Sequence, residues 1–446
     1  MVELARLDNI LGVRSKRGDV VGFHAHNMQV AKLDESAWRA LVAARQGLIP
    51  AENPDALEAL SEVRTWNSED DLTVKDAFVP LSVRSLAINI AQICNLHCGY
   101  CAAGGDGTFG DPMKEVDLGV LYEQIRMLLH DVPAGDEFKF TFLGGEPLVA
   151  PDAIRAIARF VKLQVAGRGI RVRYDIVTNG TLVTPQIADL LASIKANVTV
   201  SIDGPPEVND VSRPTRGGKG STAQTLKGIE NLVRVKHLLG SLSAGAVFGK
   251  HHTGVIATWE FLRKIPFDSL RFDFAVGDQD EAASAAYVEE LREVGDRAWT
   301  TGGEAELRRV SIYDLYFRML DSRKRIKNHC GAGKTHLHSD TRGTLTTCQW
   351  FVGDKKEKVG EGTTIDHQAL QAYADPLAEK HGCGSCWARN LCGGGCMYVN
   401  KTKTGSKHDK DTEFCIRTRS IIAKGIEYYA EARYESEQNG VQSETH

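Results

Sequence analysis

The sequence lacks features that would point to a membrane or to nucleic acid. It has no run approaching the roughly 18 uninterrupted apolar residues that a membrane-spanning helix needs. Its formal net charge is only −4, with 25% charged residues of both signs interspersed, so it has no strong field to gather nucleic acid or acidic lipid. Repeats and low-complexity tracts are also missing. We therefore expect a folded protein with neither a membrane nor nucleic acid as a partner.

A secretory signal segment is missing as well, since the start MVELARLDNI is not apolar. The chain of 446 residues is long enough to bury a large core without covalent staples. Its ten cysteines therefore do not indicate a disulfide framework, which is typical of small secreted chains. We expect a reducing, cytoplasmic location and another use for the thiols.

Short β-rich runs alternate with helical patterns in the middle of the chain, and this alternation is the main signal for the fold. Six repeats of strand and helix predict a parallel sheet with helices outside, and six are too few for a closed eight-stranded barrel. We expect an α/β fold built on a partial (β/α)6 barrel, with the chemistry at the carboxyl ends of the strands. The strand candidates are LAINIAQI, FKFTFLGG, VRYDIVTN, NVTVSID, SAGAVFG and LRFDFAVG.

The segments on either side of the barrel differ from it in pattern. VVGFHAH and MQVAKL predict two short strands, followed by a helix that Asp34 can cap and by a second helix within PAENPDALEALSEVRTW. After residue 300 the strand–helix periodicity gives way to a segment rich in Gly and Cys from His329 to Cys415, which closes with the amphipathic helix TRSIIAKGIEYYAEARY. We expect a small α+β module at 1–80, the barrel at 81–300, a cysteine-rich domain at 301–430 and a polar tail at 431–446.

Three cysteines follow directly on the first barrel strand in CNLHCGYC. Thiolates from Cys94, Cys98 and Cys101 favour a soft metal centre at the active end of the sheet. A zinc site with a distant fourth ligand, or cysteines that are merely buried, would also fit this spacing. An iron–sulfur cluster with three protein ligands would leave one iron open, which is typical of a working site.

The C-x3-C-x-aromatic-C pattern, with Tyr100 as the aromatic, resembles the signature of the radical S-adenosylmethionine (radical SAM) superfamily. The segments GGEP, VTNGTLV and VSIDGPPEVNDVSRP, which end the next three strands, are similar to segments that line the cofactor pocket in that family. Taken alone they would be ordinary turns and surface charges. The resemblance implies a [4Fe-4S] cluster whose open iron binds S-adenosylmethionine, which is cleaved to a 5′-deoxyadenosyl radical. Its implied cofactor contacts are Tyr100, Gly144, Gly145, Glu146, Pro147, Asn179, Ser201 and Arg213.

Five of these contacts have an assigned chemistry. Glu146 and the carbonyls beside it can accept hydrogen bonds from the ammonium group of the cofactor, and the two glycines let the backbone come close to a ligand. Ser201 and Arg213 could hold its carboxylate or ribose.

The seven remaining cysteines lie near the C-terminus, in a spacing similar to the SPASM extension of radical enzymes that modify peptides. Two zinc ribbons would explain the CxxC pair but not the other five cysteines. His336 and His338 lie close to Cys330 and could be ligands, although ordinary surface positions fit them better. The resemblance implies two auxiliary [4Fe-4S] clusters, one on Cys383, Cys386, Cys392 and Cys415 and one on Cys330, Cys348 and Cys396.

The SPASM resemblance implies a peptide substrate, either a precursor peptide or a small protein subunit, and a reductant such as flavodoxin or ferredoxin. The N-terminal module resembles the leader-recognition element of ribosomal peptide maturases, which would add the leader as a strand to a sheet edge. Sulfatase maturases carry an aspartate base after the cysteine that matches Cys348. Gln349 cannot accept a proton in that role, which disfavours sulfatase maturation. CAAGGDGTFG and CQWFVGDKKEKVGEG instead resemble segments of thioether-forming maturases.

We therefore expect hydrogen abstraction from a peptide carbon, followed by a cross-link to a cysteine thiolate of the peptide. Asp175, Asp273 and Gln349 are the candidate catalytic residues. One alternative keeps the radical chemistry but yields a carbon–carbon or carbon–oxygen bond, an epimerised residue or an oxidised side chain. Another makes the chain a non-enzymatic iron–sulfur or zinc carrier.

Overall fold

The computed structural model describes residues 3–14, 18–45, 54–68, 75–76, 82–101 and 112–443. Most of the segment CAAGGDGTFG and the predicted boundary at residue 80 lie outside these ranges. Two compact units are formed: unit 1 comprises 1–78, 291–330 and 376–446, and unit 2 comprises 79–290 and 331–375. The segment 301–430, expected as one domain, is thus divided between both units.

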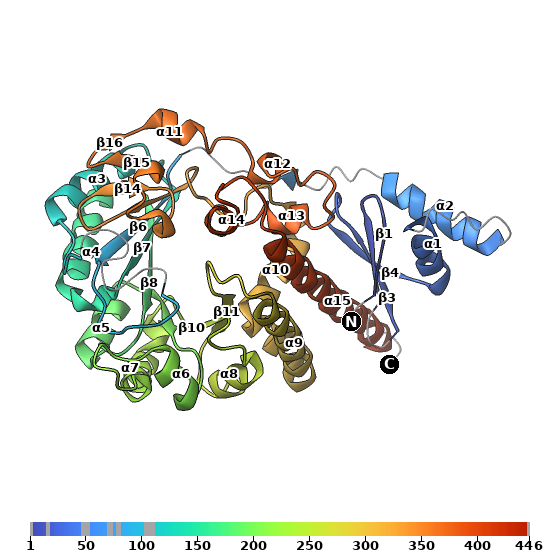
Figure 1. Cartoon of the computed structure of the whole chain (residues 1–446), viewed down its shortest axis with the longest axis horizontal. Coiled ribbons are helices and arrows are strands. Elements are labelled where there is room, and N and C mark those ends of the chain that lie inside the picture. Colours follow the sequence, from blue (N-terminus) through green and yellow to red (C-terminus); the bar gives the residue numbers. More distant parts are fainter. Residues whose placement is uncertain are drawn as a thin grey trace. The chain divides into compact units, whose positions relative to one another are not determined.

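Unit 2 is built on six parallel strands that neighbour one another in chain order (Figure 1). Every adjacent pair among them is parallel. The predicted α/β fold with six parallel strands is therefore confirmed. The strands are β6 (Ser85–Ala91), β7 (Glu137–Gly144), β8 (Arg171–Thr178), β9 (Asn197–Ser201), β10 (Ser241–Phe248) and β11 (Ser269–Phe274).

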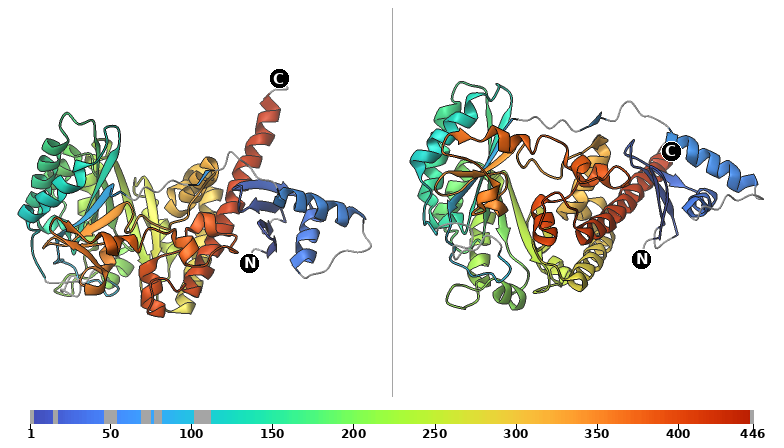
Figure 2. Two further views of the ribbon diagram at one scale, coloured as in Figure 1. Left: turned by 90° about the horizontal axis from the view of Figure 1, so that it is seen from above. Right: turned by 45° about the horizontal axis from the view of Figure 1, so that its top comes forward.

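Helices cover the outer face of these strands (Figures 1 and 2). Side chains alternate between the faces of a strand, and in β7 the fully buried Phe138, Phe140 and Phe142 point to one face. Burial of these rings stabilises the folded unit, and Phe140 and Phe142 also stack on Tyr174 of the neighbouring strand. The helices are α3 (Leu118–His130), α4 (Pro151–Val165), α5 (Pro185–Ser193), α6 (Pro206–Ser212), α7 (Thr222–Arg234) and α8 (Val255–Leu262).

The sheet of unit 2 extends beyond the predicted barrel. A seventh parallel strand, β13 (His336–Ser339), pairs with β6, and three short antiparallel strands follow it. Strands of two to four residues carry too little alternation to be detected in the sequence. The additional strands are β14 (Thr344–Thr346), β15 (Lys358–Glu361) and β16 (Thr364–Ile365), and helix α11 (His367–Gln371) comes next.

The expectation that His336 and His338 are surface histidines is wrong, because both lie in β13. His338 is fully buried and its Nε2 lies 3.0 Å from Oδ1 of Asn89 in β6. The Nδ1 atom of His336 lies 3.0 Å from Oγ of Ser85, also in β6. Burial lowers the pKa of His336 to about 4 and that of His338 to about 3, so both rings are neutral at pH 7. They join β13 to the barrel.

Unit 1 begins with a four-stranded antiparallel sheet in chain order, followed by two helices. β3, β4 and both helices confirm the predicted elements, while β1 and β2 are additional. The carboxylate of Asp34 accepts a hydrogen bond from the Ala37 amide (2.7 Å), as a helix cap does. The elements are β1 (Glu3–Leu7), β2 (Ile10–Arg14), β3 (Val20–His24), β4 (Gln29–Leu33), α1 (Glu35–Arg45) and α2 (Pro54–Ser68).

The rest of unit 1 is mainly helical. Its last helix, α15 (Thr412–Ser443), packs against β3 and β4 and continues through most of the expected polar tail. None of the helices in the described ranges combines the length and hydropathy of a membrane span. The other elements are α10 (Ser311–Ser322), α12 (Leu377–Lys380), α13 (Arg389–Cys392), α14 (Met397–Thr404) and the pair β5 (Lys75–Asp76) and β12 (Lys324–Arg325), while α9 (Glu281–Arg309) runs from unit 2 into unit 1.

The buried neutral state of His338 predicts a loss of stability in acid. The unfolded chain protonates this side chain below its ordinary pKa of 6.5 and the folded chain only near 3, so stability falls as the pH drops through this window. We expect His338 to contribute about 2 kcal/mol to the difference in unfolding free energy between pH 7 and pH 5. Urea unfolding at both pH values should therefore show a smaller difference for His338→Gln than for the unmodified protein.

His237 is exposed and serves as the matched control. We expect His237→Gln to show the same difference in unfolding free energy between pH 7 and pH 5 as the unmodified protein. An equal pH dependence for His338→Gln and the unmodified protein would contradict the buried neutral assignment.

Candidate functional site

The loop that carries Cys94, Cys98 and Cys101 begins just after β6 and is held against the end of β7 by backbone contacts. The Gly145 amide donates to the Ala91 carbonyl (2.8 Å) and the Glu146 amide to the Ile93 carbonyl (3.0 Å). A Cβ atom on Gly144 would lie 2.0 Å from the Ala91 oxygen, and one on Gly145 would lie 2.3 Å from the Ile93 oxygen. Gly144 also has a φ of 133°, which few other residues adopt. The glycine pair therefore positions the cysteine loop.

Glu146 is almost completely buried and joins the end of β7 to the end of β8. Its carboxylate accepts hydrogen bonds from Oγ1 of Thr178 (2.7 Å), the Asn179 amide (2.7 Å) and the Leu148 amide (3.0 Å). Burial raises the pKa of this carboxyl, and the three donors oppose that rise. The chain itself therefore already engages both oxygens of this carboxylate.

Asn179 directly contacts the cysteine loop. Its Nδ2 donates to Oδ1 of Asn95 (2.8 Å) and lies 3.8 Å from Sγ of Cys94. Asn95 in turn donates to Oγ1 of Thr181 (2.8 Å), which follows the same strand as Asn179. A predicted cofactor contact is thus also a neighbour of a predicted cluster ligand.

Tyr100 and Arg213 meet at the buried carboxylate of Asp203, which lies in the segment VSIDGPPEVNDVSRP but was not among the predicted cofactor contacts. The Tyr100 hydroxyl donates to Oδ2 of Asp203 (2.8 Å) and accepts a hydrogen bond from Nη1 of Arg213. Oδ2 of Asp203 also accepts from Oγ of Ser212 (2.7 Å), and Asp203 is fully buried. Its position just after β9, at the active end of the sheet, is the signal that could have identified it.

A second residue that sequence reasoning missed is His251, which follows β10. Its ring stacks on Tyr100, with the ring centroids 4.4 Å apart. Burial raises the pKa of Tyr100 well above its ordinary value, so the hydroxyl keeps its proton. The residues at the ends of β6, β9 and β10 therefore converge beside the cysteine loop.

Two thiols of this loop, those of Cys94 and Cys98, have raised pKa values. Burial raises the pKa of Cys94 to about 12, and the charges of Glu146, Cys98 and Cys101 add to this rise. Burial also raises the pKa of Cys98, against the attraction of Arg213. Without a metal these thiols are protonated at neutral pH, so cluster assembly must release protons.

The other candidate residues of unit 2 are not among these contacts. Ser201 ends β9 and is half-buried, and Pro147 is buried just after Glu146. Asp175 lies within β8 and is bound by both Arg173 nitrogens (2.9 and 3.1 Å) and by Asn197 (2.7 Å). The two remaining candidates are Asp273, which forms an ion pair with Arg271 in β11, and Gln349, which follows Cys348 in a short 3-10 helix.

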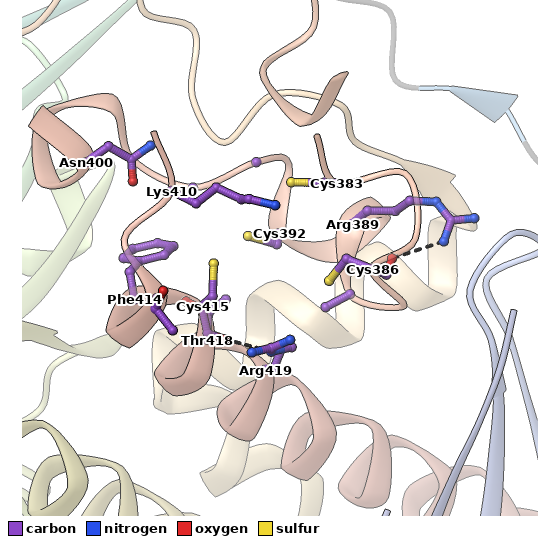
Figure 3. A pocket seen from close by; sticks show the side chains of 14 residues that line it. Cys383, Cys386, Arg389, Cys392, Asn400, Lys410, Phe414, Cys415, Thr418 and Arg419 are labelled. Atoms are coloured by element: carbon purple, nitrogen blue, oxygen red, sulfur yellow. Dashed lines mark hydrogen bonds between the residues drawn. The ribbon is translucent and has the colours of Figure 1, made fainter. Parts of the chain in front are cut away.

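Unit 1 brings together the four cysteines that were expected to share one cluster. Cys383, Cys386, Cys392 and Cys415 line a cavity of about 210 Å³, into which the ammonium group of Lys410 also reaches (Figure 3). Burial raises the pKa of Cys392 to about 12, and the other three thiols contribute to this rise. The four sulfurs are therefore close enough to interact electrostatically.

The donors around this cavity fit a cluster better than a single ion. Zinc needs its sulfurs about 2.3 Å from one point. Among the described residues, no three His, Cys, Asp or Glu side chains are placed to hold one metal ion. Four thiols around a wider space suit the larger [4Fe-4S] group, which Cys thiolates bind.

The glycines of LCGGGC allow a tight turn beside Cys392. Gly393, Gly394 and Gly395 all have positive φ values, of 67°, 95° and 81°. A Cβ atom on Gly393 would lie 2.5 Å from the backbone of Asn328, and one on Gly394 would lie 2.7 Å from that of Ala378. They allow the chain to turn tightly against its own backbone beside Cys392.

The three cysteines of the other expected auxiliary cluster belong to different units. Cys330 and Cys396 lie in unit 1, where Cys396 immediately precedes α14, and Cys348 lies in unit 2. Burial raises the pKa of Cys396. A shared cluster on these three residues stays a prediction.

Comparisons with known proteins agree with this fold. The model of the radical SAM superfamily matches residues 88–244. A cysteine-type anaerobic sulfatase-maturating enzyme of Clostridium novyi is 31% identical over 354 residues, which cover 75% of this chain and 92% of the relative. The chain therefore belongs to the radical SAM superfamily. It is an enzyme of this superfamily, whose members use S-adenosylmethionine and a [4Fe-4S] cluster.

Two solved structures share the fold. The structure of anSMEcpe with AdoMet and the Kp18Cys peptide has a TM-score of 0.64 and 17% identity, covering 79% of this chain and 99% of that one. Streptococcus suis SuiB bound to its precursor peptide SuiA has a TM-score of 0.50 and 17% identity, covering 92% and 100%.

The close approach at Gly145 predicts that a single methyl group will disturb the cysteine loop. In Gly145→Ala the new Cβ must displace the backbone at Ile93 and Cys94, so we expect loss of most of the iron bound at this loop. Iron analysis and electron paramagnetic resonance (EPR) of the reconstituted protein measure this loss. The seven C-terminal cysteines (Cys330, Cys348, Cys383, Cys386, Cys392, Cys396 and Cys415) should be replaced by Ala so that neither predicted auxiliary site contributes.

Gly99 lies inside the motif itself and is the matched control. Its Cβ would meet nothing within 4 Å, so Gly99→Ala should keep its iron. Equal iron contents in the two variants would contradict the positioning role of the glycine pair.

Proposed function

We propose that this enzyme is a radical SAM peptide maturase that forms an intrapeptide cross-link, with a cysteine thioether as its product. The observation that carries the proposal is the meeting of Cys383, Cys386, Cys392 and Cys415 around one cavity, in addition to the cysteine loop of unit 2. An oxidative cross-link suits a second redox site. The peptide loses two electrons when the bond forms, the radical takes up one of them with the hydrogen atom, and the other needs an acceptor.

The chemistry divides between the bound groups and the chain. When bound, S-adenosylmethionine and its cluster on Cys94, Cys98 and Cys101 supply the radical that removes one hydrogen atom, and the auxiliary group accepts one electron. Thioether formation joins carbon to sulfur, so the peptide loses that hydrogen atom, the thiol proton and the electron. The chain supplies position and electrostatics.

The residues around the cysteine loop have side chains and backbone groups that suit binding of S-adenosylmethionine. The network of Tyr100, Asp203 and Arg213 places a guanidinium with several donors beside the loop, which suits the cofactor carboxylate. The backbone of GGEP and the half-buried Ser201 lie at the same strand ends. These contacts remain proposals, as do flavodoxin or ferredoxin as the electron donor.

Several observations support a peptide as substrate. The solved structures that share the fold include complexes with the Kp18Cys and SuiA peptides. In the N-terminal sheet, β1 and β4 each pair with one strand among the described residues, so the sheet has two edges. We propose that a leader segment adds to one of these edges as a further strand, through main-chain hydrogen bonds.

Sulfatase maturation is the second candidate, because a relative with that activity in its name is 31% identical. The amide of Gln349 does not supply the proton acceptor expected after Cys348 in such enzymes. We therefore rank it below cross-linking. Carbon–carbon or carbon–oxygen bonds and epimerisation would use the same two redox sites.

Mass spectrometry of a candidate peptide tests the thioether directly. The peptide should come from a short cysteine-containing reading frame beside the gene, or from a small protein subunit encoded there. We expect incubation with the reconstituted enzyme, S-adenosylmethionine and dithionite to lower the peptide mass by two hydrogens and to block alkylation of one cysteine. A loss of two hydrogens with every cysteine still open to alkylation would contradict a thioether and indicate a carbon–carbon or carbon–oxygen bond. Epimerisation leaves the mass unchanged, and chiral amino-acid analysis of the peptide would detect it.

If the four cysteines hold one cluster, the iron content and the cross-linking activity should depend on each of the four thiols. We expect Cys415→Ala to lower the iron content by about four atoms and to abolish cross-linking while 5′-deoxyadenosine is still formed. Cys383→Ala should give the same result, because both thiols belong to one site. Different iron losses in the two variants would contradict a shared cluster.

A further inference from the structure

Two segments from opposite ends of the chain meet within unit 1. Nη2 of Arg6, in β1, donates to the carbonyl of Ser385, which lies between Cys383 and Cys386. In the same region, Nδ2 of Asn390 donates to the carbonyl of Ala25 (2.7 Å), just after β3. The turns of the N-terminal sheet therefore contact the loop and helix that carry three of the four cysteines.

Arg389 links these two segments through a single side chain. Its Nη1 donates to the carbonyl of Cys386 (3.0 Å) and its Nη2 to Oδ1 of Asn9 (3.0 Å), in the turn between β1 and β2. Arg389 also lines the cysteine cavity (Figure 3). A movement of the turn at Asn9 would therefore act on the hydrogen bond at Cys386.

The charges at this junction are mostly of one sign. Arg6 and Arg325 are cations close enough to the guanidinium of Arg389 for their charges to repel it. Lys410, which also lines the cavity, is a further cation close enough to Cys383 and Cys415 for its charge to favour their ionised form. Cations gathered around four thiols are favourable when the site holds a group of net negative charge. A [4Fe-4S] cluster with four thiolates is such a group, and reduction adds one more negative charge to it.

We propose that Arg6 of the N-terminal module and Arg389 together set the reduction potential of the cluster in the four-cysteine cavity. The module is then part of the redox site as well as a candidate peptide-binding element. This inference rests on the proposed iron–sulfur occupancy of the cavity. Because coupling between two sites is reciprocal, a peptide that moves β1 would shift the potential, and reduction would tighten the contact between β1 and the cysteine loop.

An anaerobic redox titration followed by EPR tests the proposal. The full chain should carry Cys94→Ala, Cys98→Ala and Cys101→Ala, so that the first cluster does not contribute, and Cys415→Ala identifies the signal of the four-cysteine site. In this background we expect Arg6→Gln and Arg389→Gln each to make the cluster harder to reduce. A tenfold fall in the ratio of reduced to oxidised cluster at fixed potential corresponds to about 59 mV for one electron.

The matched control is Arg14→Gln, in β2 of the same module. Arg14 pairs with Glu35 of α1 (2.7 Å), within the module itself. We expect its substitution to leave the potential unchanged. The double variant Arg6→Gln/Arg389→Gln should shift the potential by less than the sum of the single shifts, because the two side chains act through one loop.

Iron and sulfide analysis of every sample separates the two ways of failing. Samples without iron in the four-cysteine site would overturn the proposed occupancy and this inference with it. A loaded cluster whose potential is the same in Arg6→Gln and in the unmodified background would overturn this inference alone. Hydrogen exchange of the β1 amides gives a second readout. We expect these amides to exchange more slowly in the reduced than in the oxidised protein, and we expect this difference to be smaller in Arg389→Gln.

Discussion

The contact between the end of β7 and the start of the cysteine loop is the constraint on which the site of unit 2 depends. Gly144 and Gly145 bring two backbones so close that no side chain fits between them. Glu146 then ties the same point to β8. Asn179, at the end of β8, reaches back to Cys94. Three neighbouring strand ends are thereby fixed relative to one another, and Cys94, a predicted cluster ligand, is held in place by the chain itself.

The four-cysteine site of unit 1 is built on a different principle. Its ligands come from a loop, a short helix and the first turn of α15, and no sheet aligns them. Tight turns at Gly393 and Gly394 and the double hydrogen bond of Arg389 provide the order instead. The geometry of such a site depends on the segments that pack around it. The N-terminal sheet is one of them, through the hydrogen bonds that Arg6 donates to Ser385 and that Asn9 accepts from Arg389. In the proposed function, electron transfer is assigned to this site, and hydrogen abstraction, which needs precise positioning, to the strand ends of unit 2.

The sequence was most informative where one physical rule acts locally. Six barrel strands, the Asp34 cap and the grouping of Cys383 with Cys415 follow from periodicity, capping and a family spacing. Long-range pairing was not accessible: the short strand β13 joins β6 across some 250 residues, and this made His338 a buried residue rather than a surface one. Asp203 and Arg6 were missed for the same reason, because their partners Tyr100 and Ser385 are distant in the chain.

Reductive cleavage of S-adenosylmethionine is the most direct test of the open site at Cys94, Cys98 and Cys101. The protein should be reconstituted with iron and sulfide under anaerobic conditions, reduced with dithionite and assayed for 5′-deoxyadenosine by liquid chromatography. We predict that the unmodified protein forms this product and that Cys98→Ala does not, while Cys415→Ala still does. Absence of 5′-deoxyadenosine from the fully loaded protein, with its expected peptide present, would contradict a radical enzyme and leave an iron–sulfur carrier.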